Sequence, residues 1–358
     1  MSAEEEGDVG ASAYRRAGVD IDAQDRALSS IKELVRSTAT PGVLSELGSF
    51  GGLFRPDLAG LEEPVLVASA DGVGTKLMVA RLAGDYSTVG RDLVNHCVND
   101  ILVQGARPLF FLDYVGAGVL DEVAMRQLVG GVAAGCRENR CALLGGETAE
   151  MPGFYQPGDY ELVGFIVGLV DRPKLLDGSR VRDGDRLIGL AAAGLHTNGF
   201  SLARRALLER AQLTLDSILP GDHRALRDVL LAPHPSYLAP VGRLLDGPGL
   251  HALAHITGGG LTDNLPRVLP AGLTAIVERG TWPAPIEFEA IQSWGEVGTD
   301  EMYRVFNMGI GLVLVMAPEA CAASLASLAS SGQRAWEIGR VEAAMEGGDR
   351  GVRYRDRG

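Results

Sequence analysis

Apolar segments of strand length alternate with amphipathic segments of helical period along most of this chain, and this alternation limits the fold more than any other feature. In order, the first half contains a strand pattern at 64–70, helical patterns at 76–83 and 91–105, a strand at 108–116, a helix at 121–139 and strands at 141–146 and 160–170. The alternation predicts an α/β or α+β fold in which helices cover a sheet.

The pattern stops at residues 171–185, "DRPKLLDGSRVRDGD", and then resumes. A chain of 358 residues is long enough for two domains, each with its own core. We therefore predict an N-terminal domain at 14–172 and a C-terminal, sandwich-like α/β domain at 173–345. Residues 1–13 are predicted to be a disordered acidic tail, and residues 346–358 a polar tail.

Composition limits the partners and the compartment. The net charge is −13 and no cluster of lysine and arginine appears, which argues against binding to nucleic acid. No apolar run approaches the ~18 residues that a membrane span needs, and the N-terminus does not resemble a signal peptide. The four cysteines show no CxxC pairing, so we expect reduced thiols and a cytoplasmic protein.

The stretch "SADGVGTKL" at 69–77 follows an apolar run and suggests a phosphate-binding turn. It fails the Walker A pattern, because threonine precedes the lysine and leucine follows it, and it lacks the third glycine of GxGxxG. Its glycine N–H groups, a lysine and an aspartate still suit phosphate and Mg²⁺. The candidate nucleotide-binding residues here are Asp71, Gly72, Gly74, Thr75 and Lys76. The alternative is a tight turn with a solvated aspartate and lysine.

Two further segments carry acids. Asp92, His96, Asn99 and Asp100 form a polar stripe on the helix at 91–105, without the basic partners of a usual solvent face, so we interpret it as a ligand set. The strand at 141–146 ends in Gly145 and Gly146 and is followed by Glu147. Together, Asp71, Asp100 and Glu147 are predicted to hold Mg²⁺ bridged to ATP phosphates, although each can also be a turn or surface residue.

The second half offers "GLHTNGFSL" at 194–202, where His196 and Asn198 are predicted to project at an exposed sheet edge. His196 is our candidate for proton transfer, with a structural histidine as the alternative. The three glycines of "HITGGGLTD" predict a second anion-binding turn or close backbone packing, and His255 is expected in the core or a turn. Lys32 precedes the glycines of "LGSFGGLF", a weak signal for a mobile flap.

Seven stretches together resemble one family, phosphoribosylformylglycinamidine cyclo-ligase, also called aminoimidazole ribonucleotide synthetase. They occur in the family's order between residues 17 and 311: "AGVDIDA", "DGVGTKL", "VNDILVQGARPLFFLDY", "GGETAEMPGFY", "GLHTNGFSL", "HITGGGLTDNLPRVLP" and "EMYRVFNMGIG". The resemblance implies ATP-dependent ring closure of formylglycinamidine ribonucleotide to aminoimidazole ribonucleotide. It also implies a homodimer whose N-terminal sheets combine into a barrel.

The resemblance further implies roles for individual residues. Positions associated with nucleotide, metal or substrate are occupied by Lys32, Asp71, Lys76, Asp100, Glu147, His196 and Asn198. Our catalytic candidates are Lys32, Asp100 and His196, and our candidate nucleotide contacts are Gly145, Gly146 and Asn198 with the residues of the 71–76 turn. Asp71, Asp100 and Glu147 are the implied Mg²⁺ ligands. His96 lies outside the family pattern and receives no role.

Two alternatives stay open from the sequence. Related ATP-using enzymes that make thiamine diphosphate, selenophosphate or formylglycinamidine ribonucleotide would share the fold. The chain shows no N-terminal catalytic cysteine for selenium chemistry and is too short for a fused glutaminase. A non-catalytic nucleotide-binding regulator would bind ATP without turnover.

Overall fold

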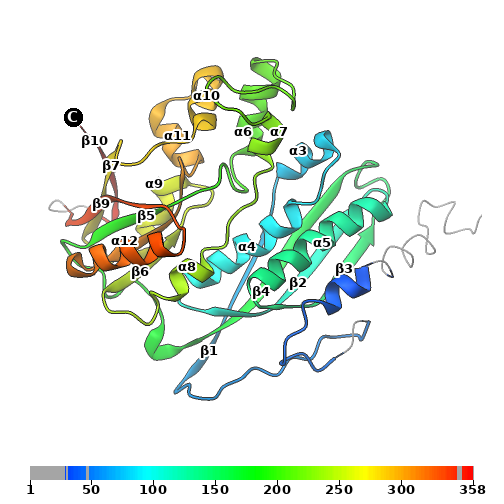
Figure 1. Cartoon of the computed structure of the whole chain (residues 1–358), viewed down its shortest axis with the longest axis horizontal. Helices are drawn as coiled ribbons and strands as arrows, with labels where there is room; N and C mark the ends of the chain where they lie inside the picture. The colour runs from blue at the N-terminus through cyan, green and yellow to red at the C-terminus, as the bar shows by residue number, and fades with distance from the viewer. Residues whose placement is uncertain (1–28, 30, 46–47, 345–348, 358) are drawn as a thin grey trace, which may run out of the picture.

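The structure is a computed structural model that describes residues 29, 31–45, 48–344 and 349–357. In this part of the chain the strands form two sheets, each accompanied by helices (Figure 1). The predicted acidic tail at 1–13 and the stretch at 17–23 lie outside the described residues. The mixed α/β class predicted from the alternation is confirmed.

The first sheet is built from residues 64–171 and has the strand order β1-β4-β2-β3. Its strands and helices are β1 (Pro64–Gly72), α3 (Lys76–Ala83), α4 (Val89–Leu102), β2 (Arg107–Ala117), α5 (Glu122–Glu138), β3 (Ala142–Glu150) and β4 (Tyr160–Asp171). β4 is antiparallel to both β1 and β2, whereas β2 and β3 are parallel.

Helices α4 and α5 pack on one face of this sheet (Figure 1). Side chains along the strands point alternately to the two faces of the sheet, and Val67 and Ile166 are buried on the face that the helices cover. On the other face Leu66 and Phe165 are 64% and 45% exposed. The first sheet therefore presents an apolar face that its own helices do not cover.

The second sheet has the order β10-β7-β9-β5-β8-β6. Its elements are β5 (Arg186–Ala191), α6 (Phe200–Arg204), α7 (Leu226–Leu230), α8 (Leu238–Gly242), β6 (Leu250–His255), α9 (Gly260–Asn264), β7 (Leu273–Arg279), α10 (Ile286–Gly295), α11 (Thr299–Val305), β8 (Ile310–Met316), α12 (Cys321–Ser330), β9 (Ala335–Ala343) and β10 (Gly351–Asp356). β8 is buried at every position, which explains its unbroken apolar sequence.

Two details differ from the sequence prediction. The segment expected to be a polar tail contains β10, which pairs in parallel with β7, because the side chains of Val352 and Tyr354 pack against the core. The prediction also lacked helices α7, α10 and α11. α7 and α11 are short, so they give little periodic signal.

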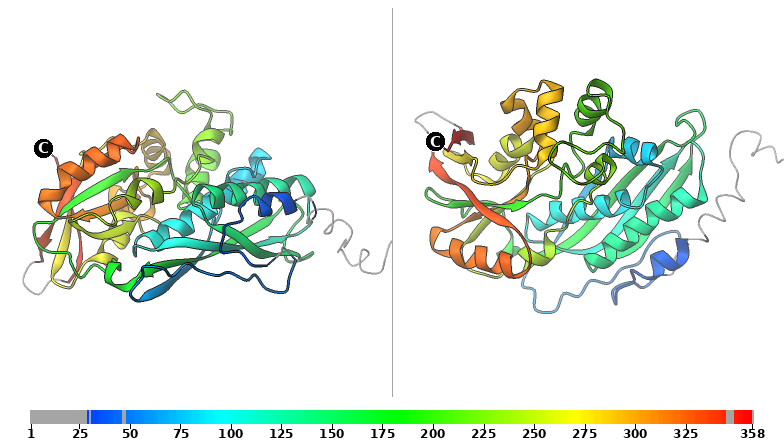
Figure 2. Two further views of the ribbon diagram at one scale, coloured as in Figure 1. Left: turned by 60° about the horizontal axis from the view of Figure 1, so that its bottom comes forward. Right: turned by 45° about the horizontal axis from the view of Figure 1, so that its top comes forward.

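The two halves meet along α4, which lies between the first sheet and residues 232–238 of the second half (Figures 1 and 2). The Asn95 side chain donates to the carbonyl of His234, and the Asp92 and Asn99 side chains accept from the backbone N–H groups of His234 and Tyr237. Three residues of α4 therefore bind the second half of the chain, and two of them, Asp92 and Asn99, belong to the polar stripe. This contact positions the side chains of the site described next.

Candidate functional site

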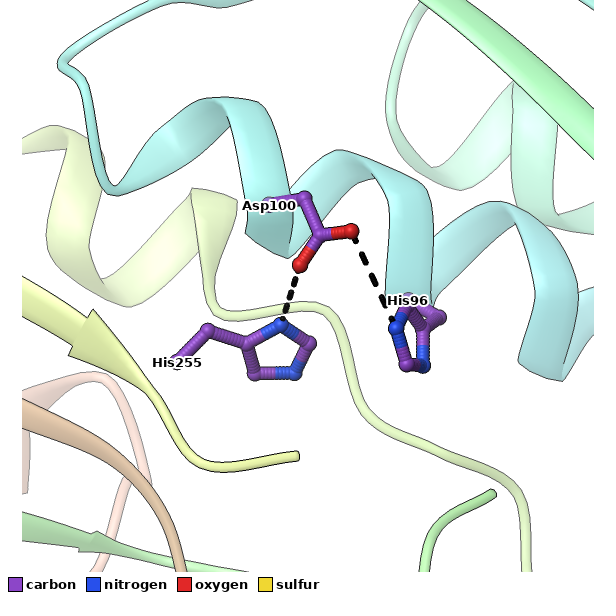
Figure 3. Close-up of side chains that lie close together, drawn as sticks. All are labelled: His96, Asp100 and His255. Atoms are coloured by element: carbon purple, nitrogen blue, oxygen red, sulfur yellow. Dashed lines mark hydrogen bonds and ion pairs between the residues drawn. The ribbon is translucent and has the colours of Figure 1, made fainter. Parts of the chain in front are cut away.

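A cluster of carboxylates and imidazoles lies where β1, α4 and β6 converge. Asp71 is at the end of β1, His96 and Asp100 are one turn apart on α4, and His255 ends β6. His96 Nε2 lies 2.7 Å from Asp71 Oδ2 and 3.8 Å from Asp100 Oδ2, while His255 Nδ1 lies 2.8 Å from Asp100 Oδ1. Figure 3 shows Asp100 between the two imidazoles. Two of the three acids predicted to hold Mg²⁺, Asp71 and Asp100, therefore converge on one site.

Local sequence explains the position of Asp71. Its carboxylate accepts from the N–H of Gly72, 2.7 Å away, and the chain then turns through Gly74, which has a φ of 54°. Glycine adopts this left-handed conformation without steric cost. The turn ends β1 and starts α3, as "DGVGTKL" predicted. It does not bring Thr75 to the cluster, because the Thr75 hydroxyl lies 3.1 Å from that of Ser201.

The charges of the cluster are coupled. Burial opposes ionisation of Asp71 and Asp100, but the neighbouring imidazoles outweigh it and lower the pKa of both carboxyls. Burial also opposes the charge on His96, yet Asp71 and Asp100 raise the pKa of this imidazole above its ordinary value. These contacts favour the ionised form of both carboxyls and the protonated form of the His96 imidazole.

Two more histidines extend the cluster into the interior. His234 Nε2 lies 3.2 Å from His255 Nε2, and the ring of His234 stacks on that of His196 at 4.0 Å between centroids. Burial, together with the positive groups around them, lowers the pKa of both His196 and His234 well below the usual range. Both are therefore neutral at physiological pH.

His196 does not occupy the exposed position predicted for it. Only 2% of the residue is exposed, and its Nε2 accepts from the backbone N–H of Ala193. It adopts a φ of 61°, and its ring also approaches Tyr237 at 6.4 Å between centroids. The flanking glycines that suggested exposure instead allow the turn to fold inward.

A pocket of about 650 Å³ opens beside the cluster. β1 contributes residues 67–71, β6 contributes residues 253–255, and Asp100, Asp177 and Arg267 add charged groups to the lining. This volume lies within the usual range for small-molecule sites. Asp71 and Asp100 are the acids that the pocket and the imidazole cluster share.

Lys76 is buried and is therefore not the solvated lysine of the alternative interpretation, while its predicted nucleotide contact stays a prediction. The side chain is fully buried, with Nζ 2.6 Å from Asp92 Oδ2 and 2.8 Å from the carbonyl oxygen of Ala232. Burial lowers the pKa of Lys76 and raises that of Asp92, and the contact between them opposes both shifts. In this structure Lys76 joins α3 to the second half.

Glu147 is not brought to Asp71 and Asp100 within one chain. β3 does not end at the glycines as predicted but continues to Glu150, so Glu147 lies within the strand. β4 and β2 separate β3 from β1, which places the two outer strands about 14 Å apart at ordinary strand spacing. Glu147 is exposed, and one of its oxygens accepts from the N–H of Thr148.

The remaining candidates have other surroundings. Gly146 faces Asp113, whose Oδ1 would lie 2.0 Å from an added Cβ, so close packing explains this glycine. Lys32 is exposed on a helical segment whose neighbour Leu34 packs near Gly130 of α5, away from the pocket lining. Asn198 lies beside Gly258, which brings the two glycine-rich turns of the second half together.

The sequence placed His96 in the ligand set on α4, without a family role, but two groups that the structure brings to the cluster were not predicted there: His255 and His234. His96 is in the polar stripe, whose lack of basic partners was the available signal. His255 ends a strand with its ring on Asp100, but an isolated histidine gives no pattern. His234 lies in "APHPSY", and only the contact between the two halves brings it to α4.

Family models match both halves of the chain. The model described as "AIR synthase related protein, N-terminal domain" matches residues 57–170, and the corresponding C-terminal domain model matches residues 182–349. A phosphoribosylformylglycinamidine cyclo-ligase from Anaeromyxobacter sp. (strain K) is 52% identical over 93% of this chain and 96% of its own length. Proteins of the same name from Oleidesulfovibrio alaskensis and Myxococcus xanthus are each 50% identical, over 94% and 93% of this chain and 95% and 96% of their own lengths.

Solved structures share the fold at lower identity. Thiamine-monophosphate kinase from Stenotrophomonas maltophilia aligns over 91% of this chain and 95% of its own, with a TM-score of 0.65 and 19% identity. A hydrogenase maturation protein HypE solved in complex with ATP aligns over 97% of this chain and 92% of its own, with a TM-score of 0.66 and 20% identity. Among the described residues, no helix combines the length and the apolar character needed to cross a bilayer.

Proposed function

The chain belongs to the AIR synthase related family, and from this premise we propose that it uses ATP to convert formylglycinamidine ribonucleotide to aminoimidazole ribonucleotide, a step of purine biosynthesis. The observation that supports this most strongly is the 52% identity to a named cyclo-ligase across almost the full length of both chains. Two of the three predicted acids, Asp71 and Asp100, border one pocket, which agrees with a nucleotide-dependent reaction.

The proposed chemistry has two steps. ATP first transfers its γ-phosphoryl group to the formamide oxygen of the substrate, and ADP leaves. The amidine nitrogen then attacks the activated carbon, a C–N bond forms, the C–O bond breaks, and inorganic phosphate leaves with that oxygen. Two protons must be lost from nitrogen and carbon to complete the aromatic ring. Such reactions depend on positioning and charge stabilisation, and no covalent bond to the protein is required.

Asp71 and Asp100 fit the role of Mg²⁺ ligands. Both carboxylates border the pocket, and the neighbouring imidazoles keep them ionised. Carboxylate oxygens are the ligands that Mg²⁺ prefers in proteins, and Mg²⁺ would neutralise charge on the ATP phosphates. Glu147 can join the set only from a second chain. ATP and Mg²⁺ are the cofactors of this proposal.

Backbone and side-chain groups around the pocket complete the proposed site. The N–H group of Gly74 is a candidate phosphate contact, whereas the N–H of Gly72 already donates to Asp71 and Lys76 would have to break its buried ion pair to reach a phosphate. His196 is neutral and enclosed, which favours positioning of its neighbours over proton exchange with solvent. Asn198 and Lys32 stay candidates by resemblance, and Gly145 and Gly146 stay candidates from the sequence pattern of their strand.

We also propose a cytoplasmic homodimer in which the uncovered face of the first sheet packs against its counterpart. Leu66 and Phe165 on that face are exposed in the single chain, and apolar side chains gathered on one sheet face favour association. In the family pattern the two sheets close into a barrel, which would also protect the edge strands. Sedimentation equilibrium should give twice the chain mass at micromolar concentration, and a stable active monomer would contradict this.

The activity is tested by measuring ADP and phosphate release from Mg-ATP with the purified chain. We expect release only when formylglycinamidine ribonucleotide is present, together with formation of aminoimidazole ribonucleotide. Thiamine monophosphate and selenide serve as control substrates. Turnover with either of them, or ATP binding without any turnover, would contradict the proposed function.

A further inference from the structure

The last strand of the chain, β10, lies beyond the residues that match the family models. The match to the C-terminal domain model ends at residue 349, and β10 covers Gly351–Asp356. The strand is at the edge of the second sheet (Figure 1), where it pairs in parallel with β7, and the side chains of Val352 and Tyr354 pack against the core. This chain therefore continues past the family match with a strand that is packed into the domain.

Arg279 of β7 holds the ring of Tyr354. The guanidinium carbon of Arg279 lies 4.5 Å from the centroid of the Tyr354 ring and 4.6 Å from that of Tyr303 in α11, and the two ring centroids are 4.9 Å apart. Arg279 Nη2 also lies 2.7 Å from Oδ1 of Asp300, near the start of α11. A cation close to an aromatic face attracts the ring. These contacts fix the Tyr354 side chain beside α11.

The hydroxyl of Tyr354 reaches α9. Its oxygen lies 2.8 Å from the hydroxyl oxygen of Thr262, and the Thr262 hydroxyl donates to the carbonyl of Tyr303 at 3.2 Å. A threonine hydroxyl has only one proton to donate, so the proton between the two hydroxyls comes from Tyr354. Burial raises the pKa of Tyr354 to about 12, so this proton is present at physiological pH. Tyr354 therefore donates a hydrogen bond to the middle of α9.

α9 and the glycine-rich turn before it form part of the wall of the pocket described above. Thr257, in the turn, and Asn264, the last residue of α9, both line the pocket. The Asn264 side chain donates to the carbonyls of Gly260 at 2.9 Å and Gly258 at 3.2 Å, which ties the turn to the helix. A shift of α9 at Thr262 would therefore move the turn and this wall of the pocket with it.

We propose that Tyr354 is a positioning residue, which through Thr262 holds α9 and the turn at 257–260 where the ribonucleotide substrate binds. This inference rests on the proposed function. Asp71 and Asp100 are assigned there to Mg²⁺ and ATP, so the wall that α9 forms is assigned to the second ligand. Tyr354 itself does not line the pocket, so its effect on the substrate passes through Thr262.

The test measures kcat and KM for formylglycinamidine ribonucleotide at saturating Mg-ATP. Tyr354→Phe removes the hydroxyl and keeps the ring beside Arg279. We expect KM to rise roughly 2- to 10-fold, the range that one hydrogen bond represents, while kcat stays within about twofold of the wild type. Thr262→Val should also raise KM, whereas Thr262→Ser, which keeps a hydroxyl, should not. An unchanged KM in Tyr354→Phe, or a lower kcat at unchanged KM, would overturn the proposal.

The matched control is Tyr86→Phe, because the Tyr86 hydroxyl donates to the carbonyl of Gly158 in the first half of the chain. KM should stay unchanged in this variant, and an equal rise there would contradict a specific role for Tyr354.

Amide hydrogen exchange provides a measurement that does not need turnover. In Tyr354→Phe, exchange at residues 258–264 should be faster than in the wild type by roughly 2- to 10-fold, because one hydrogen bond to α9 is lost. Absence of turnover in the wild type would contradict the proposed function. Unchanged exchange in Tyr354→Phe would contradict the link between β10 and the pocket wall.

Discussion

The two ends of the polar stripe on α4 contrast sharply, although the sequence presents them alike. At the first turn, Asp92 is fully buried and paired with Lys76, and this contact joins the two halves. At the last turn, Asp100 faces two imidazoles and an open pocket, and 23% of its side chain is exposed. Two aspartates on one helix face thus have different roles. Asp92 holds the two halves of the chain together, and Asp100 belongs to the candidate site.

The difference shows that periodicity places residues on a face but does not say what that face meets. Asp92 meets a lysine and a backbone N–H inside the protein, so its charge is offset by protein groups. Asp100 meets imidazoles and water, so its charge is available to a cation. Changes at the first end should therefore affect stability, and changes at the second end should affect binding.

The largest effect on stability is expected from breaking the buried ion pair between Lys76 and Asp92. Lys76→Ala leaves Asp92 buried without its partner, and such changes typically cost about 3–5 kcal/mol in the free energy of unfolding. Denaturant unfolding measures this cost. ATP affinity of the folded variant should stay close to that of the wild type, because Lys76 does not border the pocket.

The matched control is Arg81→Ala on the same helix. Arg81 pairs with Asp159 at the surface, where an ion pair contributes only about 0–1 kcal/mol. The double variant Lys76→Met with Asp92→Leu should recover only part of the lost stability, because the backbone N–H of His234 loses its acceptor, at a cost of about 1–3 kcal/mol. If Lys76→Ala instead lost ATP affinity and kept its stability, the Lys76–Asp92 pair would serve nucleotide binding and not the contact between the two halves.

Beside the Asp100 end of the stripe, the substitution Asp71→Asn in β1 should weaken the binding of Mg-ATP. The substitution removes a charge that borders the pocket, so Mg-ATP affinity should fall by roughly 10- to 100-fold and recover in part at high Mg²⁺. Calorimetric titration at several Mg²⁺ concentrations measures both effects. Asp57→Asn, an exposed aspartate of a surface turn, is the control. If the loss of ATP affinity did not depend on the Mg²⁺ concentration, Asp71 would support the structure of the site and would not bind Mg²⁺.

Substitutions at Gly145 and Gly146 of β3 can likewise distinguish an effect on stability from an effect on ATP binding. Gly146→Ala places a Cβ 2.0 Å from Asp113 Oδ1 and should cost about 1–3 kcal/mol of stability, as overpacking usually does. Gly145→Ala is the matched control, because its new Cβ meets only Leu112 at 3.8 Å. If both variants lose ATP affinity but not stability, the pair binds phosphate as the sequence suggested.

The smallest expected effect is a pH dependence from His196. The folded pKa of this imidazole lies below its ordinary value of 6.5, so the unfolded chain takes up a proton first as the pH falls. Its contribution to stability is complete above pH 6.5 and is lost as the pH falls toward the folded pKa. The slope is at most about 1.4 kcal/mol per pH unit.

His196→Asn should therefore reduce the loss of stability between pH 7.5 and 5.5, measured by denaturant unfolding at each pH. Asparagine tolerates the positive φ of this position, which limits other effects of the change. His223→Asn, at an exposed position, should leave the slope unchanged. An unaltered slope in His196→Asn would show that this imidazole is not held neutral by the fold.

Most of the fold could be predicted from local patterns. β8 and α4 follow from an apolar run and a helical period, and both depend mainly on residues close in sequence. β10 was missed because its pairing partner β7 lies more than 70 residues earlier, and a short polar strand carries little signal of its own. Asp71 and Asp100 were identified because acids near a glycine turn and on an unbalanced helix face are unusual.

The sequence by itself determined the alternation of strands and helices, the family resemblance and the acids at the pocket. These features depend on side-chain periodicity, turn chemistry and residue type, all of which can be read along the chain. Only the tertiary structure decided that Lys76 and His196 are buried and that His96, His234 and His255 share one cluster with Asp100. The reason is that burial and pKa depend on residues more than a hundred positions away, which the contact between the two halves brings to α4.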